Sequence, residues 1–128
     1  PWESAGAIVL PGGMPGATNL MASERLKEEL RKADEEGKVV AAICAAPIAL
    51  HAAGVTRGRR VAGYPGCESL CEKPGLQFNG KMSERDGNLV TAKGPGAAFL
   101  FGFEVARAVG VDESVLQSVQ NAMFVKPE

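Results

Sequence analysis

The sequence is poor in the features that mark exported, membrane-bound or nucleic-acid-binding proteins. Its 128 residues include one tryptophan, one tyrosine and one histidine, and 14 Lys and Arg nearly cancel 15 Asp and Glu. Without a charge excess, no overall field attracts polyanionic nucleic acid or an anionic membrane surface. No apolar run reaches the ~18 residues of a spanning helix, and the first ten residues lack the basic start of a signal peptide. We therefore expect a cytoplasmic protein that binds neither nucleic acid nor membrane.

Cysteine is also scarce, and its number is odd. The three thiols, Cys44, Cys67 and Cys71, belong to a chain long enough to bury a core without disulfide staples, which favours reduced thiols. Cys67 and Cys71 lie four residues apart, but no second cysteine pair or nearby histidine completes a tetrahedral zinc site. We expect no metal and no cofactor. The pair can resolve an oxidised Cys44 as a disulfide or be two ordinary loop thiols, and the second interpretation is the simpler one.

Short apolar runs that alternate with helical patterns predict one α/β domain over residues 1–128. Residues 5–10 and 38–43 are typical of buried strands in a parallel sheet. Between them we expect a helix capped by Ser23 and closed by Gly37. Further elements are expected as follows: a short helix over 45–53, a candidate strand over 61–64, a hairpin of 81–85 and 89–92 turning at Asp86-Gly87, and helices over 97–109 and from Asp112 to Asn121. Only two or three of these strands can be parallel, fewer than a covered sheet usually has, so we expect an N-terminal part of the fold to be missing.

The most informative pattern places Cys44 at the end of a buried strand and the start of a helix. Backbone N–H groups and the helix dipole there stabilise an anion, which favours a reactive thiolate over the alternative of a buried structural cysteine. Gly12 and Gly13 end the preceding strand, and adjacent parallel strands end on the same side of a sheet. With the amide of Ala45 they predict an oxyanion hole, the alternative being an ordinary glycine turn. His51 is seven residues further along the helix, roughly 10 Å away, so we expect it to be exposed or structurally satisfied.

Three motifs in order resemble one known family. They are IVLPGG at residues 8–13, AAICAAP at 41–47 and TAKGPG at 91–96. Together they look like the ThiJ/PfpI superfamily, and within it the branch of the Parkinson-disease protein deglycase and its bacterial relatives. The resemblance runs from about residue 5 to the C-terminus.

The resemblance implies a flavodoxin-like α/β sandwich with a mostly parallel central sheet, usually a homodimer. It implies that Cys44 is the nucleophile and that Gly13 and Ala45 form the oxyanion hole. The pocket residues that it implies are Gly12, Tyr64, Pro65, Gly94 and Pro95. The family's activities include glutathione-independent conversion of methylglyoxal or glyoxal to hydroxy acids, deglycation, redox sensing and chaperone-like behaviour.

Three departures from the family pattern qualify these expectations. Ala45 stands where the protease branch has His, which argues against peptidase activity, and Tyr64 stands where several deglycase relatives have His before Pro65. A glutamine amidotransferase would need a downstream His and Glu that the sequence does not supply.

The family's Glu, which hydrogen-bonds the cysteine, lies in an N-terminal segment that these residues do not contain. We therefore expect a bound N-terminal fragment, or a second chain of the same protein, to carry that Glu.

Two functions follow as hypotheses. The first is an enzyme of the glyoxalase or deglycase type, in which Cys44 attacks a small aldehyde or a glycated substrate. The second is a redox-sensing or chaperone-like stress protein in which Cys44 is oxidised to sulfinate.

Overall fold

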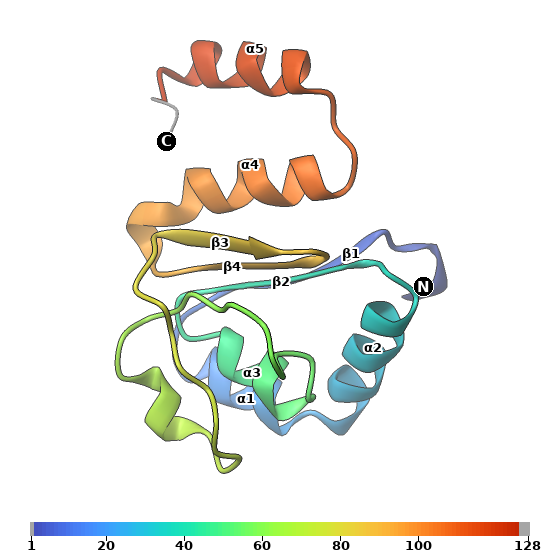
Figure 1. Cartoon of the computed structure of the whole chain (residues 1–128), viewed down its shortest axis with the longest axis vertical. Coiled ribbons are helices and arrows are strands. Elements are labelled where there is room, and N and C mark those ends of the chain that lie inside the picture. Colours follow the sequence, from blue (N-terminus) through green and yellow to red (C-terminus); the bar gives the residue numbers. More distant parts are fainter. Residues whose placement is uncertain (1, 126–128) are drawn as a thin grey trace.

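A four-stranded sheet with helices on both faces forms the centre of the computed structural model, which describes residues 2–125 (Figure 1). The strand order is β1-β2-β4-β3. β1 (Ala7–Leu10), β2 (Val39–Ile43) and β4 (Leu89–Ala92) are parallel, and β3 (Ser83–Asp86) runs antiparallel to β4. The expected α/β fold with a mostly parallel sheet is therefore confirmed.

The register of β1 and β2 brings two predicted motifs to one edge of the sheet. Both strands are apolar, and β2 is buried on both faces over most of its length, as a covered parallel strand should be. Leu10 pairs with Ala42, so the chain leaves both strands at nearly the same level. The glycine turn after β1 and Cys44 after β2 therefore meet at the carboxyl edge of the sheet.

Three helices cover one face: α1 (Gly16–Ala22), α2 (Glu24–Glu35) and α3 (Pro47–Ala52) (Figure 1). α2 begins as predicted, because the Ser23 hydroxyl accepts a hydrogen bond from the Leu26 N–H at 3.1 Å. Its apolar stripe of Leu26, Leu30 and Ala33 is buried against the sheet with residues of β2 and α3. This face holds the larger part of the core.

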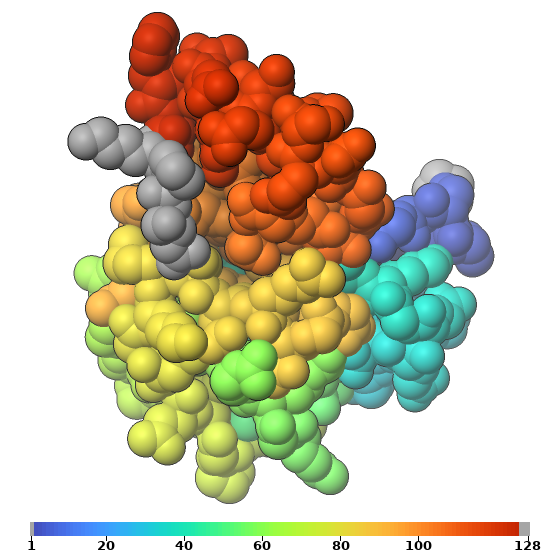
Figure 2. Space-filling model, turned by 45° about the horizontal axis from the view of Figure 1, so that its top comes forward, coloured from blue at the N-terminus to red at the C-terminus, as the bar shows by residue number. Residues whose placement is uncertain are grey.

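α4 (Ala98–Ala108) covers the opposite face, and α5 (Glu113–Met123) lies outside α4 (Figure 1). Arg107 joins the two helices, since its guanidinium donates to both carboxylate oxygens of Glu113 at 3.0 Å and to Glu104 at 2.8 Å. In Figure 2 these helices form the orange and red part of the surface above the hairpin. None of the helices between residues 2 and 125 is both long and apolar enough to cross a bilayer.

Short 3-10 helices complete the chain at η1 (Trp2–Ser4), η2 (Cys67–Leu70) and η3 (Pro95–Ala97). The hairpin is confirmed, but its two-residue turn is Gly87-Asn88, because Asp86 is still paired with Leu89 at the end of β3. Gly87 supplies the positive φ, 63°, that such a turn requires.

Three expectations about local structure were wrong. Helix α1 was not predicted: three of the first four residues of GATNLMA are the poor helix formers Gly, Thr and Asn, and the helix packs through Ala17 against Ala45 and Ile48. The helix after Cys44 begins at Pro47, two residues later than predicted. Residues 61–64 form no strand. The Ala62 N–H donates to the Thr91 side chain and not to the backbone of a neighbouring strand.

Candidate active site

Cys44 lies in a sharp turn between β2 and α3, with a left-handed backbone conformation. Its φ is 64°, a value that costs a residue with a side chain on the order of 1–3 kcal/mol and persists only where the surroundings impose it. The Cys44 N–H donates to Ala92 O at 2.9 Å, and its carbonyl accepts from the Tyr64 N–H at 2.8 Å. The elbow is thus held from β4 on one side and from the 61–64 segment on the other.

Gly12 lies directly against this elbow. A Cβ on residue 12 would come within 2.7 Å of Cys44 Cβ, 2.9 Å of Ile43 O and 3.6 Å of Cys44 Sγ. The first two distances are shorter than real Cβ contacts, so only glycine fits there without moving the elbow. The backbone of the glycine turn therefore runs alongside the thiol.

Gly13 follows Gly12 in the turn after β1, and Ala45 follows Cys44 after β2. Gly13 has a φ of 96°, and its carbonyl accepts from the Ala17 N–H at 2.9 Å, which fixes the turn to the start of α1. Ala45 is buried beside α3. Among the described residues, neither the Gly13 N–H nor the Ala45 N–H donates a hydrogen bond to protein. Both amides remain available to a ligand at the elbow, and their role as an oxyanion hole stays a prediction.

Four of the five predicted pocket residues line one cavity of about 430 Å³: Tyr64, Pro65, Gly94 and Pro95. Met82, Lys93 and Gly96 complete its wall. The Tyr64 ring lies over Gly94, where a Cβ would be 3.6 Å from Tyr64 Cδ1. The fifth residue, Gly12, contacts Cys44 instead, and the backbone bond from Tyr64 to Cys44 joins the two parts of the site.

The other two cysteines lie near the elbow rather than in a remote loop. Cys67 and Cys71 are half-buried and pack with Leu76 and Met21 against the cluster that contains Ala45. Burial raises the pKa of the Cys67 thiol, and the negative charges of Cys44 and Glu68 raise it further. Burial also raises the pKa of Cys71, where the charges that add to it are those of Glu68 and Cys67. Within residues 2–125, no three His, Cys, Asp or Glu side chains are grouped so as to hold a metal ion.

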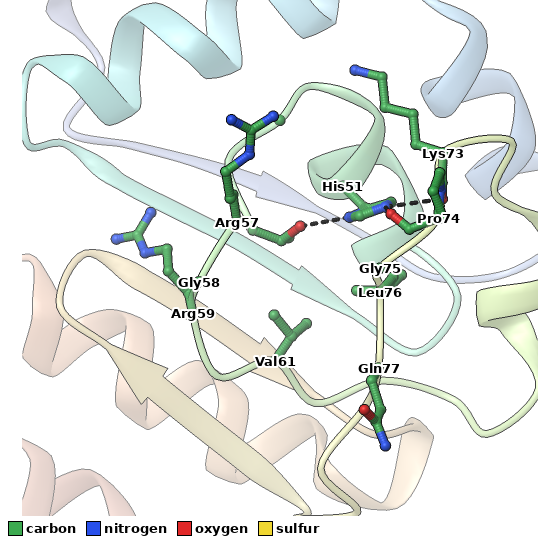
Figure 3. Close-up of a pocket in the computed structure, with 12 residues that line it drawn as sticks. His51, Arg57, Gly58, Arg59, Val61, Lys73, Pro74, Gly75, Leu76 and Gln77 are labelled. Atoms are coloured by element: carbon green, nitrogen blue, oxygen red, sulfur yellow. Dashed lines mark hydrogen bonds between the residues drawn. The ribbon is translucent and has the colours of Figure 1, made fainter.

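His51 is structurally satisfied, as predicted. Its Nδ1 lies 2.7 Å from the Thr56 hydroxyl, and its Nε2 lies 3.1 Å from the carbonyl oxygens of Lys73 and Pro74 (Figure 3). Both carbonyls can only accept, so Nε2 is the donor to them, and Nδ1 is engaged with the Thr56 hydroxyl. The ring ties two loops together, and no nitrogen is left to act as a base at Cys44.

A second cavity, of about 610 Å³, opens beside His51 between residues 54–61 and 73–77 (Figure 3). It is larger than the cavity at Tyr64, but neither Cys44 nor the glycine turn lines it. Sequence reasoning missed it, because its walls are two loops joined by long-range hydrogen bonds that leave no local pattern. The left-handed elbow and the glycine turn lie at Cys44 instead.

Comparison with known proteins decides the family. The sequence profile described as the DJ-1/PfpI family matches residues 2–108. The chain belongs to the DJ-1/PfpI family. It is 34% identical over 117 residues to Protein DJ-1alpha of Drosophila melanogaster. This match covers 91% of this chain and 54% of that protein. It is 39% identical over 90 residues to a protein of Pyrococcus abyssi named a deglycase, covering 70% of this chain and 54% of that one.

The fold agrees with solved structures of the DJ-1/PfpI family. The crystal structure of Drosophila melanogaster DJ-1beta superposes with a TM-score of 0.86 at 31% identity, covering 98% of this chain and 68% of that chain. The chain therefore has the α/β fold of the DJ-1 structures. It spans about half the length of the curated relatives that it matches, such as the 54% of DJ-1alpha.

Proposed function

We propose that the protein is a cysteine-dependent enzyme that acts on reactive carbonyls, of the glutathione-independent glyoxalase or protein deglycase type. One observation carries this proposal: Cys44 sits in a left-handed elbow against which the Gly12 backbone packs directly. Carbonyl addition requires a nucleophile beside preorganised N–H donors, and we propose the Gly13 and Ala45 N–H groups for that role, since neither donates to a described residue. The similarity to a protein named a deglycase in Pyrococcus abyssi supports the same reaction class.

The proposed reaction begins with the Cys44 thiolate. Its sulfur adds to the aldehyde carbon of methylglyoxal, a C–S bond forms, and the carbonyl π electrons move onto the oxygen, which the Gly13 and Ala45 N–H groups hold. A base then moves the proton from that carbon to the neighbouring carbon through an enediol, which leaves a lactoyl thioester on Cys44. Water hydrolyses the thioester, releasing lactate and the free thiol, so no oxidant or reductant is consumed.

We propose that the base comes from outside these 128 residues. No side chain of residues 2–125 hydrogen-bonds to Cys44 Sγ, and His51 is committed to Thr56 and two carbonyls. The family's glutamate, carried by a bound N-terminal fragment or by a second chain of the same protein, would supply the carboxylate. Intact mass under native and then denaturing conditions tests this: a co-purifying fragment or a second copy is expected, and a lone chain with full turnover would contradict it.

Lactate formation from methylglyoxal tests the role of Cys44. We expect Cys44→Ala to abolish lactate formation and Cys71→Ser to retain it, because only the first substitution removes the nucleophile. Unchanged turnover in Cys44→Ala would overturn the mechanism. An equal loss of lactate formation in both variants would mean that the substitutions disturb folding. Circular dichroism of each variant checks whether it is folded.

A homodimer remains part of the proposal. Three apolar side chains at helical spacing on α5, Val115, Val119 and Met123, are 40–51% exposed, so one face of this helix is apolar and uncovered. Light scattering coupled to gel filtration measures the assembly directly. We expect a dimer for the protein and a monomer for Val119→Asp, and a monomer in both cases would contradict this part.

A further inference from the structure

The backbone brings Cys67 to the Cys44 elbow through two consecutive hydrogen bonds. The Tyr64 N–H donates to Cys44 O at 2.8 Å, and the Cys67 N–H donates to Tyr64 O at 3.1 Å. Cys67 is the first residue of η2, which follows the left-handed Gly66, with a φ of 96°. The turn that carries Cys67 is therefore connected, through Tyr64, to the carbonyl group of Cys44.

Packing places the Cys67 side chain on the inner side of this turn. Cys67 is half-buried and packs against the cluster of Ala17, Ala45 and Ile48, and Ala45 is the residue directly after Cys44. Residues of α3 and η2 are in contact. Cys71 belongs to the same cluster, but its N–H bonds to Glu68 O at the far end of η2. Of the two loop thiols, Cys67 is the one whose backbone is tied to the elbow.

The charges around the two loop thiols also distinguish Cys67 from Cys71. The charge of a Cys44 thiolate raises the pKa of Cys67, after burial, whereas the charges that raise the pKa of Cys71 are those of Glu68 and Cys67. A neutral sulfenic acid at Cys44 would remove this contribution, whereas the contribution of burial would stay.

We infer that Cys67 is a resolving cysteine, which converts an oxidised Cys44 into a Cys44–Cys67 disulfide. A hydroperoxide is the oxidant: Cys44 sulfur attacks its terminal oxygen, the O–O bond breaks, and Cys44 becomes a sulfenic acid. The Cys67 thiolate then attacks Cys44 sulfur, the S–S bond forms, the S–O bond breaks, and water leaves. Two electrons pass from the two thiols to the peroxide, and a cellular dithiol can return them.

This disulfide would protect Cys44 from the irreversible sulfinic acid. Closing it requires the two Cβ atoms to come to about 3.8 Å. η2, which carries Cys67, lies between Gly66 and Gly75, two glycines of positive φ. The inference rests on the reactivity proposed for Cys44 and not on its carbonyl chemistry. It also changes the interpretation of the two loop cysteines, which the sequence alone did not favour as redox partners.

Mass spectrometry of the protein treated with one equivalent of hydrogen peroxide tests the inference. We expect the intact mass to fall by two hydrogens, a non-reducing digest to contain a peptide joining Cys44 to Cys67, and dithiothreitol to reverse both changes. Cys67→Ser should lose this disulfide completely and gain oxygen atoms at Cys44 instead. Cys71→Ser, the matched control, should form the disulfide like the unaltered protein.

Two results would overturn the inference: oxygen addition at Cys44 in the unaltered protein equal to that in Cys67→Ser, or a disulfide that joins Cys71 to either partner in place of Cys44–Cys67. Methylglyoxal turnover, measured before oxidation on the same samples, separates this inference from the proposed function. Turnover without the disulfide would overturn only the resolving role of Cys67. The disulfide without turnover would overturn only the carbonyl chemistry.

Discussion

Gly12 and Cys44 lie closer together than any side chain on residue 12 would allow, with 2.7 Å between a Cβ built on Gly12 and the Cys44 Cβ. The contact joins the ends of β1 and β2, which are separated by two helices in sequence. It makes the position of the thiol depend on a residue that has no functional group. The glycine motif is thus a steric requirement of the elbow as well as a source of amides.

We expect Gly12→Ala to displace Cys44 and lower its reactivity. A shift of about 1 Å at a reacting atom can reduce turnover by roughly a hundredfold, so both iodoacetamide labelling of Cys44 and methylglyoxal turnover should fall by at least about tenfold. Gly6→Ala is the control, because a Cβ there meets no atom within 4 Å. Equal labelling rates in both variants would show that the elbow tolerates the contact.

Thr91→Val should destabilise the protein. Thr91 is fully buried in β4, and its hydroxyl accepts from the Ala62 N–H at 2.9 Å, so valine leaves that buried donor without a partner. An orphaned buried donor costs about 1–3 kcal/mol, which urea denaturation measures as a fall in the free energy of unfolding. Thr91→Ser keeps the hydroxyl and loses only a methyl group. If serine proved as costly as valine, packing and not the hydrogen bond would be the cause.

Ser23→Ala should cost about 1 kcal/mol of unfolding free energy, because it removes the cap that accepts from the Leu26 N–H. The matched control is Ser118→Ala, an exposed position within α5, where loss of the hydroxyl should change stability little. Thermal unfolding of both variants measures the difference. A similar midpoint for the two would argue that α2 is held by its buried stripe alone.

Glu68→Gln should move the alkylation of Cys67 and Cys71 to lower pH. The negative charge of Glu68 contributes to the raised pKa of both thiols, so its removal lets each thiolate form at a lower pH, although burial still acts. The pH dependence of iodoacetamide labelling, followed by peptide mass, measures the shift. Glu72→Gln is the control, since Glu72 is exposed and is not among the causes of either shift. An equal shift in both variants would count against a specific role for Glu68.

Elements whose causes are local could be predicted from the sequence. The Ser23 cap, the apolar strands and the placement of Cys44 at the end of β2 follow from neighbouring residues, and the structure confirms them. Elements held by distant partners could not be predicted. α1 depends on contacts of Ala17, and residues 61–64 are placed by Thr91 and by Cys44 O. The proximity of Cys67 to the elbow is of the second kind, since it depends on the hydrogen bond from the Tyr64 N–H to Cys44 O, between residues far apart in the sequence.

The two edges of the sheet differ in how readily they could pair with another strand. β3 forms one edge and carries Glu84, Arg85 and Asp86, charges that discourage another strand from pairing there. β1 forms the other edge with the sequence AIVL, and within the described residues its only strand neighbour is β2. Val9 on this strand is 46% exposed. An apolar edge of this kind can accept a further strand, so we expect the bound N-terminal fragment or second chain of the proposal to add to the sheet beside β1.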